Sequence, residues 1–265
     1  MIPLKDDNPT KGRPIVSYGI IGFCILIFLA QTGLSETELR DFTYSYGLIP
    51  SVLMGIDQLP NDLYRISPIG TIFTSMFMHG GWMHLIGNMV FLWIFGDNIE
   101  DSMGHKKFLI FYLLSGIAAA LLQASIDPES NVPMIGASGA IAGILGAYLV
   151  LHPKANVNVL FWLFIFITVI KVPAFIVLSI WIISQFFSVS MGNEGGIAYF
   201  AHIGGFIAGC LLIYFFKYSH IRLFQEGNSK SFESSNFSIE GFFSQRKERD
   251  FMQEFIDTAN KKDKN

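Results

Sequence analysis

Residues 134–151 read MIGASGAIAGILGAYLVL, an uncharged stretch that includes Ser138. Residues 197–216 read IAYFAHIGGFIAGCLLIYFF and include His202. An uncharged serine is common in apolar helices, whereas a histidine is costly there and usually has a function. If the two helices bring these side chains into contact, Ser138 and His202 form a nucleophile and its general base. Contact between these two stretches is therefore the main structural expectation of the sequence.

The composition indicates a protein that crosses a membrane several times. Of the 265 residues, 51% are hydrophobic and 15% are charged, whereas soluble domains carry about a quarter charged residues. The apolar residues fall in blocks long enough to span a bilayer, which takes roughly 20 residues per helix. We therefore predict an all-α, polytopic membrane protein surrounded by lipid. The net charge of −3 gives no indication of a nucleic-acid partner.

Six predicted spans divide the chain into three parts. A polar head, residues 1–13, and a polar tail, residues 219–265, flank a six-span domain, residues 14–218. A long loop, residues 31–81, separates the first two spans, and the sequence identifies no partner for the tail. The approximate spans are Pro14–Ala30, Trp82–Phe95, Phe108–Ile126, Met134–Leu151, residues 173–190 and Ile197–Phe216.

The stretch 155–190 allows two interpretations. It is apolar nearly throughout, but Pro173 interrupts it, and proline suits the first turn of a helix rather than its interior. The fifth span is therefore placed at residues 173–190. Residues 156–170 are then an apolar connecting loop or an interfacial segment. The alternative is a further span, for which about 15 residues are short.

Basic residues predict the orientation, because Lys and Arg near span ends favour the cytoplasmic side. The head, the turns after spans two and four and the chain after span six carry Lys5, Lys11, Arg13, Lys106, Lys107, Lys154, Lys217 and Arg222. The loops between them carry Asp127, Glu129 and Glu194. Six spans put every basic segment on one side, so both termini are expected in the cytoplasm, most simply across a bacterial inner membrane. A seventh span would put the tail on the wrong side.

Three spans bring polar groups to a similar depth below the outer surface. Ser138 is expected about four residues into span four and His202 about five residues into span six, which is roughly 6–8 Å at 1.5 Å per residue. His84 and Asn88 lie one turn apart at comparable depth in span two. Four unpaired polar groups at one depth would be costly, and a catalytic site explains both their identities and their burial.

Small residues at four-residue spacing predict which spans are neighbours, because they let helices approach closely in lipid. Such pairs occur in spans four and six: Gly139 with Gly143, Gly205 with Gly209, and Gly204 with Ala208. These two spans are therefore expected to pack face to face, with Ser138 opposite His202.

Other intramembrane chemistries fit less well. A zinc site could use three histidines as ligands, His79, His84 and His202. However, no HExxH motif occurs and no acid lies near them in the spans. Neither a metal nor another cofactor is therefore expected. An aspartyl protease needs a pair of carboxylates in its spans, which these spans lack. His79, just outside span two, is expected in a loop or at the surface.

Three segments together resemble the rhomboid family of intramembrane serine proteases. Residues 136–140, GASGA, resemble the family's GxSG segment, and residues 201–209, AHIGGFIAG, resemble its last helix. Residues 79–88, HGGWMHLIGN, resemble its second helix. The resemblance covers about residues 14–216, and the motifs occur in the family's order and spacing.

The resemblance implies a six-helix rhomboid-like bundle and a set of roles. Ser138 would be the nucleophile and His202 its base, a dyad without an acid. His84, Asn88 and the backbone N–H of Ser138 would stabilise the oxyanion, and Gly136 would keep the approach to the substrate carbonyl open. The long loop would partly embed in the outer leaflet, and the fifth helix would gate substrate entry from lipid.

Two positions depart from the family pattern. Many relatives have Trp-Arg where this chain has Gly70-Thr71, so the long loop is expected to be anchored differently. Some bacterial members have a tyrosine four residues after the serine, stacked on the histidine, where this chain has Ala142. Either another ring orients His202 or its position is looser. Trp181 and Gln185, four residues apart, are similar to the family's fifth helix.

The sequence therefore predicts a serine endopeptidase that cleaves transmembrane proteins in or near their membrane segments through an acyl-enzyme. A helix offers no free backbone to attack, so small, helix-destabilising residues are expected near the scissile bond. The alternative is a non-catalytic rhomboid-like protein that binds membrane clients, against which the intact Ser138 and His202 argue. A transporter would need inverted repeats or charged midplane groups, which the spans lack.

Overall fold

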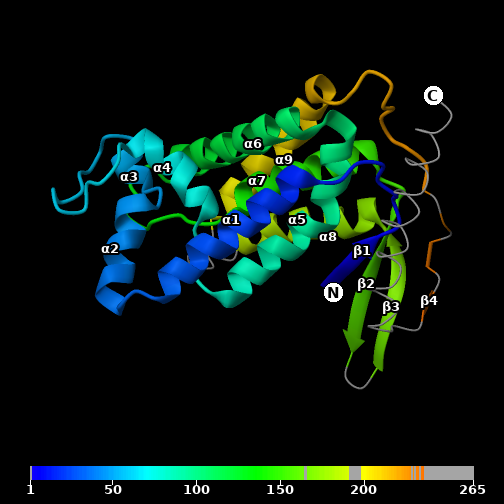
Figure 1. The fold of residues 1–265 in the computed structure, drawn as a ribbon, viewed down its shortest axis with the longest axis horizontal. Helices are drawn as coiled ribbons and strands as arrows, with labels where there is room; N and C mark the ends of the chain where they lie inside the picture. Colours follow the sequence, from blue (N-terminus) through cyan, green and yellow to red (C-terminus); the bar gives the residue numbers. More distant parts are fainter. Residues whose placement is uncertain are drawn as a thin grey trace, which may run out of the picture.

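Helices account for most of the protein in the computed structural model, which describes residues 2–163, 166–190, 198–227, 229, 231–232 and 234–235 (Figure 1). The helices are α1 (Ile15–Thr32), α2 (Glu36–Tyr46), α3 (Pro50–Leu53), α4 (Pro68–Thr74), the 3₁₀ turn η1 (Ser75–Phe77), α5 (Trp82–Met103), α6 (His105–Ile126), α7 (Ser138–Leu151), α8 (Ala174–Ser190) and α9 (Tyr199–Phe216). The predicted class, a helical membrane bundle, is confirmed.

Six of these helices correspond to the six predicted spans. Three of them, α1, α6 and α9, are long and apolar enough to cross a bilayer by length and composition. α7 and α8 are apolar but shorter, and α5 has 22 residues and ends in a polar turn. The predicted loop at residues 191–196 lies outside the described residues, as does most of the predicted tail, residues 219–265.

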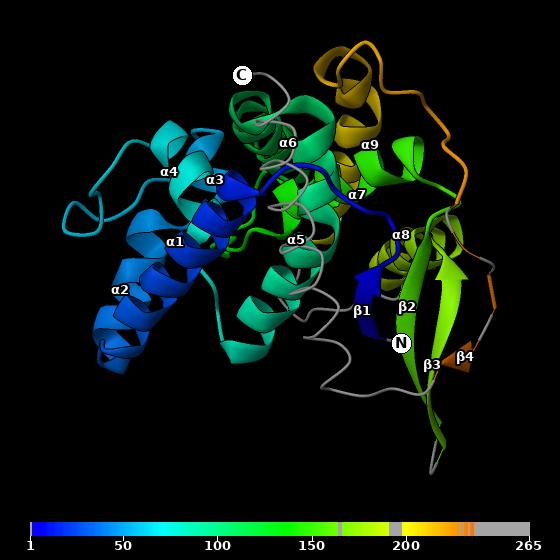
Figure 2. The ribbon, with the colours of Figure 1, turned by 45° about the vertical axis from the view of Figure 1, so that its right-hand side comes forward.

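α7 is the centre of the bundle. It packs against α5, α6, α8 and α9, and its side chains at Ile144, Leu145 and Tyr148 are fully buried. Both ribbon views place α2, α3 and α4 at one end of the bundle and the β-strands at the other (Figures 1 and 2). The site residues near the start of α7 therefore lie toward the α2–α4 end.

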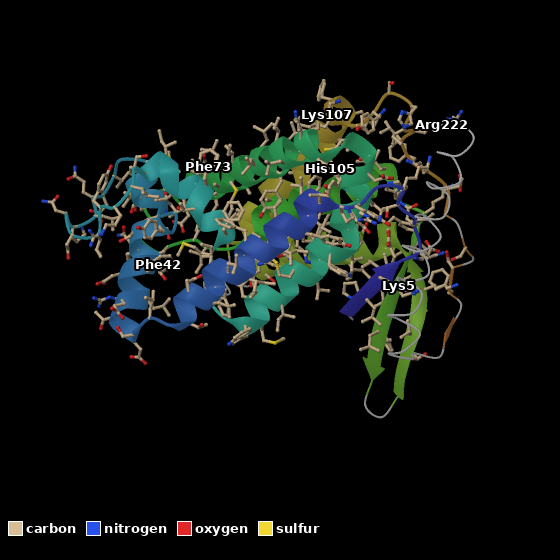
Figure 3. All side chains as sticks on the ribbon, in the orientation of Figure 1. Lys5, Phe42, Phe73, His105, Lys107 and Arg222 are labelled. Atoms are coloured by element: carbon tan, nitrogen blue, oxygen red, sulfur yellow. The ribbon has the colours of Figure 1, made fainter. Side chains whose placement is uncertain are left out.

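Basic side chains gather at the opposite end, which carries the strands. Lys5, Lys107 and Arg222 all lie there in Figure 3, whereas Phe42 and Phe73 lie at the α2–α4 end. The side chain of Lys107 reaches the carbonyl of Phe216 at the end of α9, at 3.4 Å. The basic turns that the sequence analysis placed on one side of the membrane thus share one end of the molecule.

A small antiparallel sheet at one end of the bundle corrects the expectation for residues 156–170. β1 (Ile2–Asp6), β2 (Asn156–Leu163), β3 (Phe166–Pro173) and β4 (Ser234–Ser235) pair in the order β1-β2-β3-β4. Residues 156–163 and 166–170 are therefore strands, not a connecting loop or a further helical span.

The reason for this error is that β2 is buried on both faces. Val157 and Val159 are 0% and 1% exposed, but the intervening Asn158 is also buried. A strand covered on both sides reads as a continuous apolar run, and periodicity cannot separate such a run from a buried helix. The feature of the sequence that favours a strand here is the β-branched residues at alternate positions, Val157 and Val159.

Glu100 explains why α5 continues through the polar stretch that was predicted to be a turn. Its side chain is 1% exposed and accepts hydrogen bonds from the backbone N–H groups of Val16 and Ser17, both at 2.8 Å, and from the Ser17 hydroxyl at 2.7 Å. It also contacts His105 Nδ1 at 2.6 Å. A carboxylate here satisfies the free donors of the first turn of α1 and opposes its positive dipole end.

The long loop, residues 31–81, is largely helical and is fastened at several points. Leu48 pairs with Met134 as an isolated β-bridge, and the Thr74 hydroxyl donates to the Tyr46 carbonyl at 2.6 Å. The Gln31 side chain accepts from the backbone N–H of His79 at 3.2 Å and donates to its carbonyl at 3.3 Å. These contacts anchor the loop in this chain, which has Gly70-Thr71 where many relatives have Trp-Arg.

Two glycines of α9 let its backbone contact the backbone of α7. A Cβ on Gly205 would overlap the carbonyl of Gly139, and one on Gly209 would overlap the carbonyl of Gly143. The predicted face-to-face packing of spans four and six is confirmed. Gly204 differs from the prediction, because it faces α6, where an added Cβ would lie 2.9 Å from Leu122 Cβ.

We predict that Gly205→Ala lowers the free energy of unfolding by about 1–3 kcal/mol, because the methyl group forces the two helix backbones apart. Gly19→Ala in α1 is the matched control, since nothing lies within 4 Å of the added Cβ there. Chemical unfolding in detergent micelles, followed by circular dichroism, measures both. Equal stability of the two variants would contradict a tight contact between α7 and α9.

Candidate active site

The structure brings Ser138 and His202 together across the contact between α7 and α9. His202 Nε2 lies 2.8 Å from Ser138 Oγ, within hydrogen-bonding distance. α7 begins at Ser138 itself and α9 at Tyr199, so the serine is the first residue of its helix rather than the fifth. The depth of Ser138 therefore cannot come from preceding helical residues, as the sequence had indicated.

Ser138 is sunk into the protein because α7 is short. Its 14 residues span about 21 Å at 1.5 Å per residue, whereas the hydrocarbon core is about 30 Å thick. The chain before it is not helical, and such backbone is tolerated at membrane depth only where protein partners satisfy it. Met134 and Leu48 exchange backbone hydrogen bonds at 2.7 and 3.0 Å, and Gly136 donates to the Ser75 carbonyl at 2.8 Å.

The His202 ring is held from three sides. Its Nδ1 lies 2.8 Å from Gln185 Oε1. The Trp181 ring lies against it with centroids 5.7 Å apart and planes tilted by 36°, and the Tyr199 ring approaches edge-on at 6.4 Å. These rings take the place of the tyrosine that some relatives carry at the position of Ala142. Sequence reasoning noted Trp181 and Gln185 but gave them no role.

Gly136 leaves an open space next to both reactive groups. Its φ of +132° is a conformation that side chains disfavour. A Cβ built there would lie 2.8 Å from His84 Nε2 and 3.6 Å from Ser138 Oγ. His84 and Ser138 therefore border the same small volume, and only glycine keeps it free for another atom.

Hydrogen-bond donors lie on the α5 and α7 sides of this space. Gly80 N–H donates to His84 Nδ1 at 3.4 Å, so the neutral ring carries its proton on Nε2, toward Gly136. Asn88 is 8% exposed, and its Nδ2 has no hydrogen-bond partner among the described residues. The Ser138 N–H belongs to the first turn of α7, where intrahelical acceptors are lacking.

A small cavity of about 50 Å³ adjoins Ser138. Its walls come from α4, η1, α6, α7 and α9 and from the segment before α7. They include Ile72, Met76, Gly116, Ala119, Met134, Gly139 and Ala201. A space of this size, with mostly small and apolar walls, admits a small side chain but not a large one.

His79 lies in the loop between η1 and α5, as expected, but it is buried and not at the surface. Its side chain is 1% exposed, and its ring meets the His84 ring edge-on, with centroids 5.2 Å apart. Burial and the neighbouring His84 lower the pKa of His79 to about 4. His79 thus packs behind a site residue, although a histidine before a predicted span gives no such signal in the sequence.

The described residues contain no group of three or more His, Cys, Asp or Glu side chains that could hold a metal ion. The chemistry available at the site is instead that of a hydroxyl, a neutral imidazole and several N–H donors. Together they define a polytopic membrane protein with a half-buried serine–histidine pair.

Comparison with known proteins places this chain in a family. The model of the Rhomboid domain matches residues 61–219. The chain is 32% identical over 234 aligned residues to Rhomboid protein 1, mitochondrial, of Saccharomyces cerevisiae, covering 76% of this chain and 63% of that protein. It is 31% identical to RHOMBOID-like protein 4 of Arabidopsis thaliana, covering 72% and 44%. The chain belongs to the rhomboid family.

A bacterial relative carries a protease name. Rhomboid protease GluP of Bacillus subtilis is 30% identical over 142 residues, which cover 52% of this chain and 25% of that protein. The alignments with these relatives span less than two thirds of each relative's length. Family membership and a location in the membrane follow from these matches.

We predict that acid destabilises the fold partly through His79. Its folded pKa of about 4 lies below the unfolded value near 6.5, so between these values the unfolded chain binds a proton that the folded protein rejects. Stability is therefore lost as the pH falls from 6.5 to 4, by up to about 3 kcal/mol. His79→Phe is expected to reduce this slope, as measured by chemical unfolding at each pH.

The pH dependence of stability is not expected to disappear in His79→Phe, because burial also lowers the pKa of His152 to about 4. His220→Asn is the control, since that side chain is exposed. An unchanged slope in His79→Phe would show that the buried ring does not resist protonation.

Proposed function

We propose that this chain is a serine endopeptidase that hydrolyses peptide bonds in or near the transmembrane segments of membrane proteins. The observation that carries the proposal is the 2.8 Å contact between Ser138 Oγ and His202 Nε2, located at the half-buried start of α7. The activity is assigned to the six-span domain, residues 14–218. The protease name of the GluP relative supports it.

The proposed reaction is acyl transfer through the serine. His202 Nε2 takes the hydroxyl proton as Ser138 Oγ attacks the substrate carbonyl, and the tetrahedral intermediate collapses when the imidazolium protonates the leaving amine. Water then attacks the acyl carbon while His202 Nε2 takes its proton, and the imidazolium returns a proton to Ser138 Oγ as the ester C–O bond breaks and the carboxylic acid product leaves. Among the described residues, the hydrogen-bonding partners of His202 are the neutral side chains of Gln185 and Ser138, not a carboxylate.

The oxyanion is assigned to the space beside Gly136. His84 Nε2–H borders this region, the Ser138 backbone N–H belongs to the first turn of α7, and Asn88 lies one helical turn after His84 on α5. Donors fixed before the reaction stabilise developing charge strongly where water is scarce. Asn88 Nδ2 has no hydrogen-bond partner among the described residues, which supports this role because a buried donor without a partner is otherwise costly.

The proposed substrate enters from lipid as an unwound segment. The cavity of about 50 Å³ beside Ser138 favours a small residue at the position whose carbonyl is attacked. α8 presents Ile183, Phe186 and Phe187 to the surroundings, an apolar face suited to a transmembrane substrate. No cofactor is assigned to the reaction.

The proposed location is a bacterial inner membrane with both termini in the cytoplasm. The support is the collection of basic turns at the end of the molecule that carries the sheet, as seen for Lys5, Lys107 and Arg222 (Figure 3). The positive-inside rule assigns this end to the cytoplasm, so the α2–α4 end faces outward. The head, residues 1–13, and the tail, residues 219–265, are then cytoplasmic.

A non-catalytic rhomboid-like protein that binds membrane clients is the second candidate. It would use the same apolar surface but would need neither a serine hydroxyl nor a base. The hydrogen-bonded pair and the donors around Gly136 favour the enzyme, because client binding explains none of them.

We predict that Ser138→Ala and His202→Ala each lower cleavage of a single-span model substrate in liposomes by at least about 10³-fold. Each removes one partner of the proton transfer. Wild-type protein is expected to label covalently with a fluorophosphonate probe, and both variants are expected to lose this label. Gel analysis of the cleaved substrate and of the label measures the two effects.

Ser125→Ala is the matched control, because this exposed serine of α6 donates its hydroxyl proton to the carbonyl of Leu121 in its own helix, at 2.7 Å. It should cleave and label as the wild type does. Wild-type protein that neither cleaves nor labels would favour the non-catalytic candidate, and cleavage by Ser138→Ala would reject Ser138 as the nucleophile.

We further predict that Asn88→Leu lowers kcat by about 10²-fold with a small change in KM. Losing one oxyanion donor costs about 3–4 kcal/mol of barrier at most, and the substituted side chain has a similar volume. Steady-state kinetics with the model substrate separate the two constants. An unchanged kcat would remove Asn88 from the oxyanion site.

A further inference from the structure

Gln185 lies against the nitrogen of His202 that does not face the serine. It comes from α8, whereas His202 comes from α9 and Ser138 from α7. Gln185 is 8% exposed, and its Oε1 lies 2.8 Å from His202 Nδ1. Three helices therefore form one line of contacts, from the Gln185 amide through the imidazole to the Ser138 hydroxyl.

The neighbours of Gln185 determine which way its amide points. Its Nε2 donates to the Trp181 carbonyl at 3.1 Å and to the Ser184 hydroxyl oxygen at 3.0 Å. Ser184 in turn donates its hydroxyl proton to the same carbonyl at 2.6 Å. Because the carbonyl only accepts, the nitrogen of the amide must face it, and Oε1 must face His202.

This orientation determines the tautomer of His202. Oε1 only accepts, so Nδ1 must carry the imidazole proton. Neutral imidazole then has its lone pair on Nε2, which is the nitrogen 2.8 Å from Ser138 Oγ. In the opposite tautomer the ring could not accept the serine proton, and two acceptors would face each other at Nδ1.

We propose that Gln185 is a positioning residue of the serine–histidine site, which holds His202 in the tautomer and ring orientation required of a base. The inference rests on the proposed function. The amide contributes what a carboxylate contributes in a triad, namely an acceptor for Nδ1–H, without an ionised group in the apolar bundle, where burial of an unpaired charge is costly. It also keeps its hydrogen bond when His202 becomes an imidazolium.

Gln185→Met tests the role, because it keeps the length of the side chain and removes the acceptor. We expect kcat for the model substrate to fall about 10- to 100-fold, the effect of losing a hydrogen bond to a group that becomes charged, with KM changed less than about threefold. Gln185→Glu retains an acceptor and should recover most of kcat. Gln123→Met is the matched control: this glutamine of α6 accepts from the Ala201 N–H at 3.3 Å, beside His202, and its loss should leave kcat unchanged.

A spectroscopic measurement tests the inference apart from activity. Solid-state NMR of ¹⁵N-histidine-labelled protein in liposomes, with His202 assigned by its loss in His202→Gln, should show a protonated Nδ1 and an unprotonated Nε2. In Gln185→Met the proton should shift toward Nε2. A wild-type His202 protonated on Nε2, or a kcat of Gln185→Met equal to the wild type, would overturn the positioning role.

The two proposals fail in different ways. If wild-type protein does not cleave or label, the proposed function falls, and the NMR spectrum still shows whether Gln185 holds the tautomer. If Ser138→Ala abolishes cleavage and Gln185→Met does not affect it, the function stands and the role of Gln185 is rejected.

Discussion

The approach of α9 to α7 sets the geometry on which the site depends. Gly205 and Gly209 touch the carbonyls of Gly139 and Gly143, so the two helix axes are as close as their backbones allow. At this separation a serine at the start of one helix and a histidine in the first turn of the other reach each other directly. Larger side chains at these glycines would separate the two helices and lengthen the contact between His202 and Ser138.

Polar groups are divided between the two ends of the bundle. At the α2–α4 end, Ser138, His202 and Gln185 form a neutral chain of contacts. At the other end, Glu100 binds the first turn of α1, and Asp6 accepts hydrogen bonds from Asn98 and Tyr148. The buried carboxylates at that end are paired with several hydrogen-bond donors, whereas the site itself is built from groups that are neutral at rest. This division is consistent with the cost of burying charge in an apolar interior.

The sequence predicted the features that depend on residue type and spacing. The length of the apolar stretches predicted a membrane bundle, and the four-residue spacing of the glycines predicted that α9 packs against α7. The position of Ser138 was wrong by one helical turn, because the irregular backbone of residues 134–137 is set by contacts with Leu48 and Ser75. The environments of His79 and Gln185 were missed for the same physical reason: burial and partners from other helices are tertiary properties. The strand at residues 156–163 was missed because its alternation ends at Val159 and the residues that follow read as an unbroken apolar run.

The sheet has a consequence for how this molecule is made. Ile2 pairs with Leu160 and Asp6 with Val157, so the first strand leaves the ribosome on the order of 150 residues before its partner. At translation rates of about 5–20 residues per second, it waits roughly ten to thirty seconds. During this interval β1 lacks its neighbouring strand, and its charged Lys5 and Asp6 disfavour premature self-association. Completion of the β2–β3 hairpin supplies that neighbour before α8 and α9, which follow in the chain, have been synthesised.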